Sequence, residues 1–179
     1  MALSCNLTKS LLKSNTCDYN LPEVKDIYIA NYNDVESAER EYNCESGVTI
    51  SALTFATGAS VYHIEPTKNS VSYTDELVVE DNGNKYRTHT LTFGISGKYD
   101  KDMVCPIDAL SLGRFFVVVK TANDEYLALG RSTGLEASAQ SIAGGSDNNG
   151  ITVTLSANVA ESVVPLSETA VTTLLGKVA

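Results

Sequence analysis

Tryptophan is absent from this chain, and the residues that bind structural metals are few and scattered. The 179 residues include two histidines and four cysteines, Cys5, Cys17, Cys44 and Cys105, with no C-x-x-C pair among them. Structural zinc is therefore not expected, because zinc sites draw their ligands from closely spaced pairs. The first ten residues hold no continuous apolar stretch, so no secretory signal is expected and reduced thiols are favoured. A Cys5–Cys17 bridge is the alternative.

Long apolar runs and an excess of basic charge are also missing. No apolar run approaches the roughly 20 residues that a membrane-spanning helix needs, so no membrane partner is expected. The formal charge is −9, from 13 Lys and Arg against 22 Asp and Glu. A protein that grips phosphate backbones needs a basic surface, so DNA binding of that kind is excluded. The acidity serves either solubility or a surface past which nucleic acid slides without sticking.

Known catalytic motifs are also absent from the sequence. The chain has no nucleophile elbow, Walker loop, G-x-G-x-x-G or H-E-x-x-H sequence. His63 and His89 both lie within alternating segments, which favours ordinary strand residues over catalytic ones. Two acidic turns, at residues 80–83 and 147–150, lack the register of a calcium-binding loop, and Asp, Asn and Gly favour turns for backbone reasons alone. The sequence thus predicts a protein that is not an enzyme and has no cofactor.

What the sequence does contain is alternation of apolar and polar residues, which predicts strands. Asn82-Gly83 lies between two alternating runs and predicts a hairpin, and Gly58 indicates a bulge or a bend within a long strand. The run RFFVVVKT at 114–121 is apolar on both faces, as in a central strand buried on both sides. The predicted strands cover residues 25–32, 47–64, 70–79, 85–96, 114–121, 125–131 and 151–159.

Helices are expected to be few and short. Asp34 is placed to cap a helical turn over 35–42, and residues 102–113 carry apolar groups near helical spacing. Val171, Leu174, Leu175 and Val178 fall at helical spacing near the end of the chain. Residues 132–150 are polar and glycine-rich, and are expected to form a long loop.

Together these patterns predict a mainly β fold. We expect a β-sandwich or partly closed barrel of about six to seven strands with one short flanking helix. The predicted organisation is an N-terminal arm at 1–23, a single β domain at 24–160 and a C-terminal extension at 161–179.

Several blocks, in order along the chain, resemble a family of bacteriophage structural proteins, the tail tube or major tail proteins. They span most of residues 15–159. The blocks are Cys17-Asp18 with VKDIYIANY (24–32), YTDE (73–76) with TLTF (90–93), FFVVVK (115–120) with EYLALG (125–130), GLEA (134–137), and ITVTL (151–155). The resemblance implies a virion structural protein whose subunits form rings, usually hexameric, which stack into a tube that conducts DNA.

The resemblance also suggests which segments make the assembly contacts. The predicted hairpin is the candidate interface, with Asp75, Glu76, Glu80, Asp81, Asn82 and Gly83 as its residues. The polar loop is the candidate contact between rings, with Gly144, Gly145, Asp147 and Asn148. Further expected partners are other tail or neck proteins and DNA that passes without specific binding. The expected location is the virion tail, after assembly in the host cytoplasm.

Two alternatives remain open. One is another phage component of the same fold, namely a neck, tail-completion or capsid decoration protein. The other is a β-sandwich binding module for carbohydrate or a cell surface. Such modules usually display exposed aromatic residues, above all tryptophan, which this chain lacks.

Overall fold

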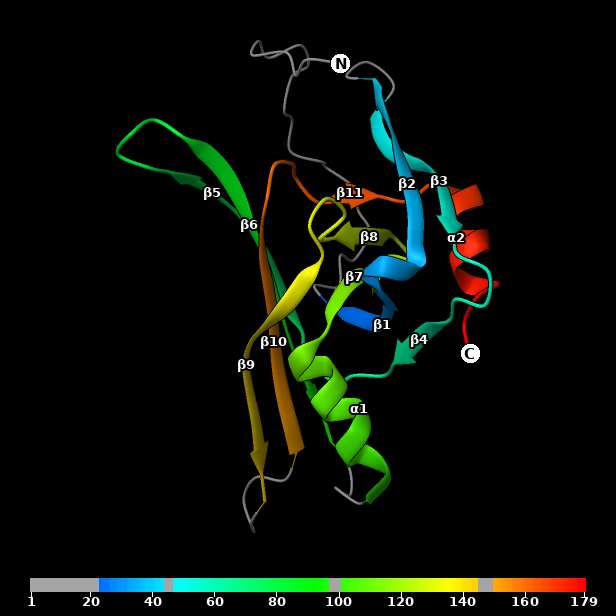
Figure 1. Ribbon diagram of the computed structural model, residues 1–179, viewed down its shortest axis with the longest axis vertical. Helices are drawn as coiled ribbons and strands as arrows, with labels where there is room; N and C mark the ends of the chain where they lie inside the picture. Colours follow the sequence, from blue (N-terminus) through cyan, green and yellow to red (C-terminus); the bar gives the residue numbers. More distant parts are fainter. Residues whose placement is uncertain (1–22, 44–46, 97–100, 145–149) are drawn as a thin grey trace, which may run out of the picture.

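The described part of the computed structural model comprises residues 23–43, 47–96, 101–144 and 150–179. It contains eleven strands, two α-helices and a short 3-10 turn at Tyr32–Asp34 (Figure 1). The strands are β1 (Val24–Asn31), β2 (Val35–Asn43), β3 (Gly47–Phe55), β4 (Val61–Ile64), β5 (Ser72–Val79), β6 (Lys85–Ile95), β7 (Arg114–Thr121), β8 (Tyr126–Leu129), β9 (Leu135–Ala143), β10 (Gly150–Val159) and β11 (Val164–Pro165). The helices are α1 (Lys101–Leu112) and α2 (Glu168–Leu175).

Three layers make up the fold, and β7 lies in the middle one. Hydrogen bonds join β4, β1, β7, β8 and β11 into this middle layer. The sheet continues through β9, β10, β6 and β5 as an outer layer, joined to β7 only through the first two residues of β9. The third layer is the separate β2–β3 hairpin with α2 beside it. The predicted mainly β, sandwich-like fold with a flanking helix is confirmed.

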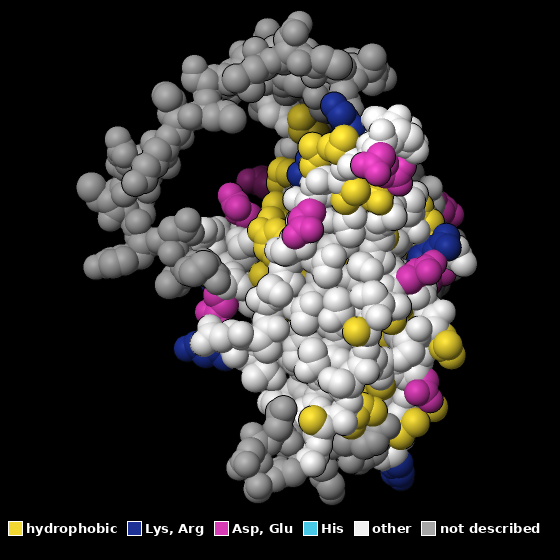
Figure 2. Space-filling model, turned by 90° about the vertical axis from the view of Figure 1, so that its left-hand side faces the viewer, with side chains coloured by type: hydrophobic (Ala, Val, Ile, Leu, Met, Phe, Trp, Pro, Cys, Tyr) yellow, Lys and Arg dark blue, Asp and Glu magenta, His cyan; other side chains and the backbone are white. Residues whose placement is uncertain are grey.

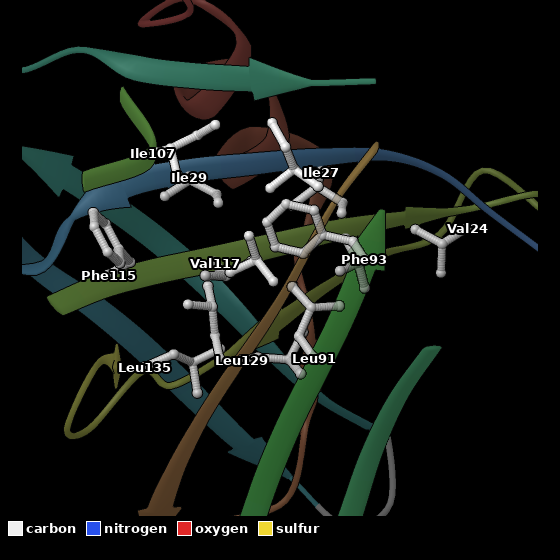
Figure 3. Close-up of a cluster of buried hydrophobic side chains, with 14 residues drawn as sticks. Val24, Ile27, Ile29, Leu91, Phe93, Ile107, Phe115, Val117, Leu129 and Leu135 are labelled. Atoms are coloured by element: carbon white, nitrogen blue, oxygen red, sulfur yellow. The ribbon is translucent and has the colours of Figure 1, made fainter. Parts of the chain in front are cut away.

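The first hydrophobic core lies between the middle and outer layers (Figure 3). Ile27 and Val117 from the middle layer meet Leu91 and Phe93 from the outer layer, and each side chain is fully buried. The inward face predicted for residues 151–159 is confirmed, because Ile151, Val153, Leu155 and Val159 are buried. Ile107 of α1 covers one end of this core.

The second core lies between the middle layer and the β2–β3 hairpin. Phe116 and Val118 point into it from β7, opposite to Val117. The prediction that 114–121 is buried on both faces is therefore confirmed. Helix α2, which was predicted near the C-terminus, contributes Ala170 and Leu174 to this core. Its first turn is capped by Ser167, whose hydroxyl accepts a hydrogen bond from the Ala170 N–H.

The structure corrects three sequence-based expectations. Residues 35–42 are not a helical turn but most of β2, which pairs with β3 along its length. Several residues of this segment favour a helix, but hydrogen bonds and packing with a neighbouring strand stabilise the extended conformation more. Residues 135–143, expected within a long loop, form β9, which pairs with β10. The expected long strand at 47–64 is divided into β3 and β4, and the chain turns between them at Gly58, where φ is +82°.

Candidate functional site

The hairpin of β5 and β6 projects from the body of the molecule at one end of its long axis (Figure 1). The two strands pair continuously from Ser72 opposite Thr92 to Val79 opposite Lys85. Gly83 adopts φ +87° in the connecting turn, which its missing side chain permits. Strand β5 is the last in the sheet order, so its outer edge pairs with no strand of the described chain. Free strand edges are sites where another chain can add a strand.

One face of the hairpin continues the core-facing side of the outer layer into solvent. Near the body, Tyr73 packs against the first core beside its cross-strand partner Leu91. Four and six residues further along the strand, Leu77 is 57% exposed and Val79 is 56% exposed. Alternation along β5 places all of these residues on the same side. We call Leu77, Val79 and Lys85 the inner face of the hairpin. Exposed apolar residues grouped in this way mark interaction surfaces.

Asp75 lies at the base of the hairpin and ties it to the body. Its carboxylate accepts hydrogen bonds from Arg87 Nε at 2.5 Å and from the Val163 N–H at 3.0 Å. Burial alone would raise the pKa of Asp75, but the bonds from Arg87 and Val163 hold that pKa below its ordinary value of 3.8. Arg87 belongs to the hairpin and Val163 to the segment before β11. Asp75 therefore restricts the angle at which the hairpin leaves the body.

His89 is buried directly beneath Asp75. Only 1% of its surface is exposed, and Nδ1 accepts a hydrogen bond from the Gly130 N–H at 3.3 Å. Nε2 has no hydrogen-bond partner, because Asp75 Oδ1 lies 3.6 Å away. Burial lowers the pKa of His89, and this effect outweighs the opposing influence of Asp75 and Glu161. His89 is thus held neutral, with its proton on Nε2.

Glu161 is the third element of the network at the hairpin base. Its side chain is 6% exposed and accepts bonds from Arg131 Nε at 2.7 Å, Arg131 Nη2 at 2.5 Å and Arg40 Nη1 at 2.9 Å. Arg131 also donates to the carbonyl oxygen of Ala38 at 2.9 Å. Two cations from β2 and the β8–β9 turn therefore converge on one buried carboxylate, which joins the third layer to the middle one.

A groove of about 450 Å³ lies between the hairpin and the body above this network. Its lining combines apolar groups with three cationic side chains and one acid. The lining residues are Arg40, Val48, Leu77, Lys85, Tyr86, Arg87, Ala160, Glu161, Ser162, Val163, Val164 and Pro165. Arg87 is occupied by Asp75, whereas Lys85 makes no ion pair with the described residues. The groove is open, and its walls suit an apolar segment that carries a negative charge.

The residues proposed from sequence for the assembly hairpin all lie on it, but in different surroundings. Asp75 is partly buried in the network rather than displayed, and Glu76 is exposed on the opposite face of β5. Glu80, Asp81, Asn82 and Gly83 form the exposed turn, where Asn82 and Asn84 donate to Glu80 Oε2. Of the loop residues proposed for contacts between rings, Gly144 is exposed after β9. Gly145, Asp147 and Asn148 lie outside the described residues.

Sequence reasoning missed Leu77, Val79 and Glu161. The alternation of β5 indicates which residues share a face, but it cannot show that the strand extends beyond the body. Glu161 follows the last strand predicted from the sequence, and a charged residue at such a position ordinarily lies in solvent. Its burial arises because Arg40 and Arg131, distant in sequence, approach it from two other elements.

Metal and membrane features are not evident in the described parts of the chain. No group of three or more His, Cys, Asp and Glu residues there is arranged to hold a metal ion. Neither helix in these parts has the length and apolar character that a membrane span requires. Cys105, exposed on α1, is a free thiol. Comparison of the chain with protein-family models, curated proteins and solved structures found no match.

The buried histidine predicts a pH-dependent stability. The pKa of His89 is lower in the folded protein than its ordinary value of 6.5, so the unfolded chain binds more protons below pH 6.5. We expect the free energy of unfolding to fall as the pH decreases below about 6.5. Above about pH 6.5, His89 does not make the free energy of unfolding depend on pH. Asp75, whose pKa is lowered, adds a second decrease at still lower pH, below its ordinary value of 3.8.

Urea titrations at intervals from pH 8 to pH 5 measure this effect. His89→Gln should flatten the decrease between pH 6.5 and pH 5. A decrease of unchanged steepness in His89→Gln would show that other groups, and not this buried imidazole facing Asp75, Arg87 and Glu161, are responsible.

Proposed function

We propose that this chain is a virion structural protein, a subunit of a bacteriophage tail tube that assembles with copies of itself through the β5–β6 hairpin. The observation that carries the proposal is the hairpin itself. It projects from a well-packed body, is fixed at its base by Asp75, and exposes Leu77 and Val79 together with a free strand edge. An isolated monomer gains no stability from such a projection, whereas an assembly can bury its apolar face.

The outward face of the outer layer supports passage of DNA without specific binding. The outward-facing sides of β6 and β10 carry short hydroxyl side chains that are half-buried or exposed, and Lys and Arg are absent from these positions. The residues are Thr88, Thr90, Thr92, Thr152, Thr154 and Ser156. Figure 2 shows a broad uncharged area on this side, with charged groups mostly toward its borders. A neutral polar surface on a chain of net charge −9 provides no cationic groups to bind the phosphates of DNA.

The resemblance to tail tube proteins gives the remaining parts of the proposal. We propose that the subunits form hexameric rings and that these rings stack into a tube. The tube is assembled in the host cytoplasm and becomes part of the virion tail. Other tail or neck proteins would contact the ends of that tube. The proposal includes no enzymatic activity and no cofactor.

Negative-stain electron microscopy of the purified chain, at increasing concentration, tests this function. Stacked rings or tubes with a central channel are expected. Closed rings that never stack would instead favour a neck or tail-completion protein. Monomers at every concentration, even with seeds of phage tails added, would contradict self-assembly and favour a binding module.

A variant pair tests the role of the hairpin. Leu77→Asp with Val79→Asp should raise the concentration needed for assembly by more than about tenfold, because loss of about 1.4 kcal/mol per contact already has that effect. Thr74→Asp is the control, because Thr74 lies on the same strand but faces the opposite side. Both variants should unfold at nearly the wild-type temperature. Equal loss of assembly in both would show that the inner face is not the specific contact.

A further inference from the structure

Helix α1 presents an exposed apolar face that the fold leaves uncovered. Ile107 is buried, and Met103 and Leu110 pack beside it against the first core. Val104, on the flank of the helix, is 37% exposed, and Leu112, on the side opposite Met103 and Leu110, is 89% exposed. These two residues are eight positions apart, so they share one face of the helix.

Two charged residues lie on the same side of the helix, Lys101 in its first turn and Asp108 between Val104 and Leu112. Asp108 lies midway between Val104 and Leu112, four residues from each, and is exposed. No ion pair or hydrogen bond with the described residues involves its carboxylate. We call Val104, Asp108 and Leu112 the exposed face of α1; these three residues combine two apolar side chains with one carboxylate that has no partner among the described residues.

The inner face of the hairpin has the complementary composition. Leu77 and Val79 offer exposed apolar side chains of similar size, and Lys85 offers a positive charge without a partner among the described residues. Lys85 lies directly across from Val79, so its charge sits beside the apolar pair. The groove of about 450 Å³ next to it is lined by Leu77 and Lys85 on the hairpin side. Apolar contacts with a matched charge pair are typical of specific protein interfaces.

These two surfaces lie far apart on one molecule. Figure 1 shows the hairpin at the upper end of the long axis, with its tip directed away from α1, which lies in the lower half. One copy therefore cannot join its own hairpin to its own helix. A contact between two copies leaves one hairpin and one helix free, so further copies can add until the arrangement closes into a ring or continues as a stack.

We propose that the inner face of the β5–β6 hairpin of one copy binds the exposed face of α1 of a second copy. Leu77 and Val79 then pack against Val104 and Leu112, and Lys85 pairs with Asp108. This inference rests on the proposed self-assembly and specifies which two surfaces of the chain meet.

Cross-linking tests the contact directly, because the free thiol of Cys105 already lies exposed on α1 beside Val104. In a background that carries Cys5→Ser, Cys17→Ser and Cys44→Ser, so that Cys105 is the one native thiol left, Val79→Cys introduces a thiol on the hairpin face. A short bismaleimide should then link this thiol to Cys105 between copies, giving covalent ladders on denaturing gels, with the joined peptides identified by mass spectrometry. Thr74→Cys, on the opposite face, should give no link to Cys105. In that background, Cys105→Ser should abolish the ladder.

A charge exchange supplies a second, independent measurement. Lys85→Glu alone and Asp108→Lys alone should each raise the concentration needed for assembly by about two- to fivefold, the range of an exposed ion pair. The double exchange should restore the wild-type value. Failure to restore it, with no link between positions 79 and 105 in particles that do assemble, overturns the inference and leaves the proposed function standing. Absence of any assembly overturns both.

Discussion

Replacing Glu161 with alanine should lower the free energy of unfolding by about 3–5 kcal/mol, the cost of removing one partner from a buried ion pair. The Glu161 carboxylate is nearly inaccessible to water and receives three hydrogen bonds from Arg40 and Arg131. Without it, two guanidinium groups remain close together and partly buried, and the negative charge that Glu161 placed between them is lost. Repulsion between them should loosen β2 from the body.

Guanidinium chloride titrations at neutral pH measure this change. The control is Glu136→Ala, because Glu136 pairs with Arg114 at 2.7 Å while both side chains are more than half exposed. That control should cost no more than about 1 kcal/mol, since water screens an exposed pair. Equal losses in the two variants would contradict a special role for burial at Glu161.

Phe93→Ala should lower the free energy of unfolding by about 3–5 kcal/mol, as expected when a large aromatic side chain is removed from a packed core. Phe93 is fully buried between the two main layers, where Figure 3 shows its ring pointing toward Ile27 and Val117. The surrounding side chains come from several strands paired in a fixed register, so they can move only partly into the space left by the ring.

Two measurements on Phe93→Ala distinguish its effect on stability from its effect on assembly. Thermal unfolding should give a clearly lower midpoint than the wild type, whereas Tyr62→Ala, at a side chain 53% exposed, should shift the free energy of unfolding by no more than about 0.5 kcal/mol. Phe93 lies on β6, the strand that also forms half of the hairpin. Assemblies of the Phe93→Ala variant should therefore dissociate at a lower temperature than those of the wild type. A stable Phe93→Ala protein would show that this core is much more adaptable than its packing indicates.

The regular elements that could be predicted from sequence share one property: their patterns are local. The run at 114–121 predicted a doubly buried strand because every residue from Phe115 to Val119 is apolar. Alternation at 151–159 predicted the inward face of β10, and Asn82-Gly83 predicted the hairpin turn. Apolar spacing likewise predicted α1 and α2.

The elements that could not be predicted depend on partners elsewhere in the chain. Strand β2 has a polar, helix-compatible sequence, and it is extended because β3 pairs with it. Strand β9 carries small and polar residues, and its ladder with β10 supplies the order that its own side chains do not. In both cases backbone hydrogen bonds to a neighbouring strand, which no local pattern reveals, outweigh intrinsic preference.

For the candidate site, the division between sequence and structure follows the same physical reason. The sequence by itself determined that β5 and β6 form a hairpin, since alternation and turn chemistry act over a few residues. Only the tertiary structure decided that the hairpin extends past the body, so that Leu77 and Val79 are exposed while Tyr73 on the same face is packed against the core. It also decided that His89, Asp75 and Glu161 meet beneath the hairpin, because burial and long-range pairing are properties of the whole fold.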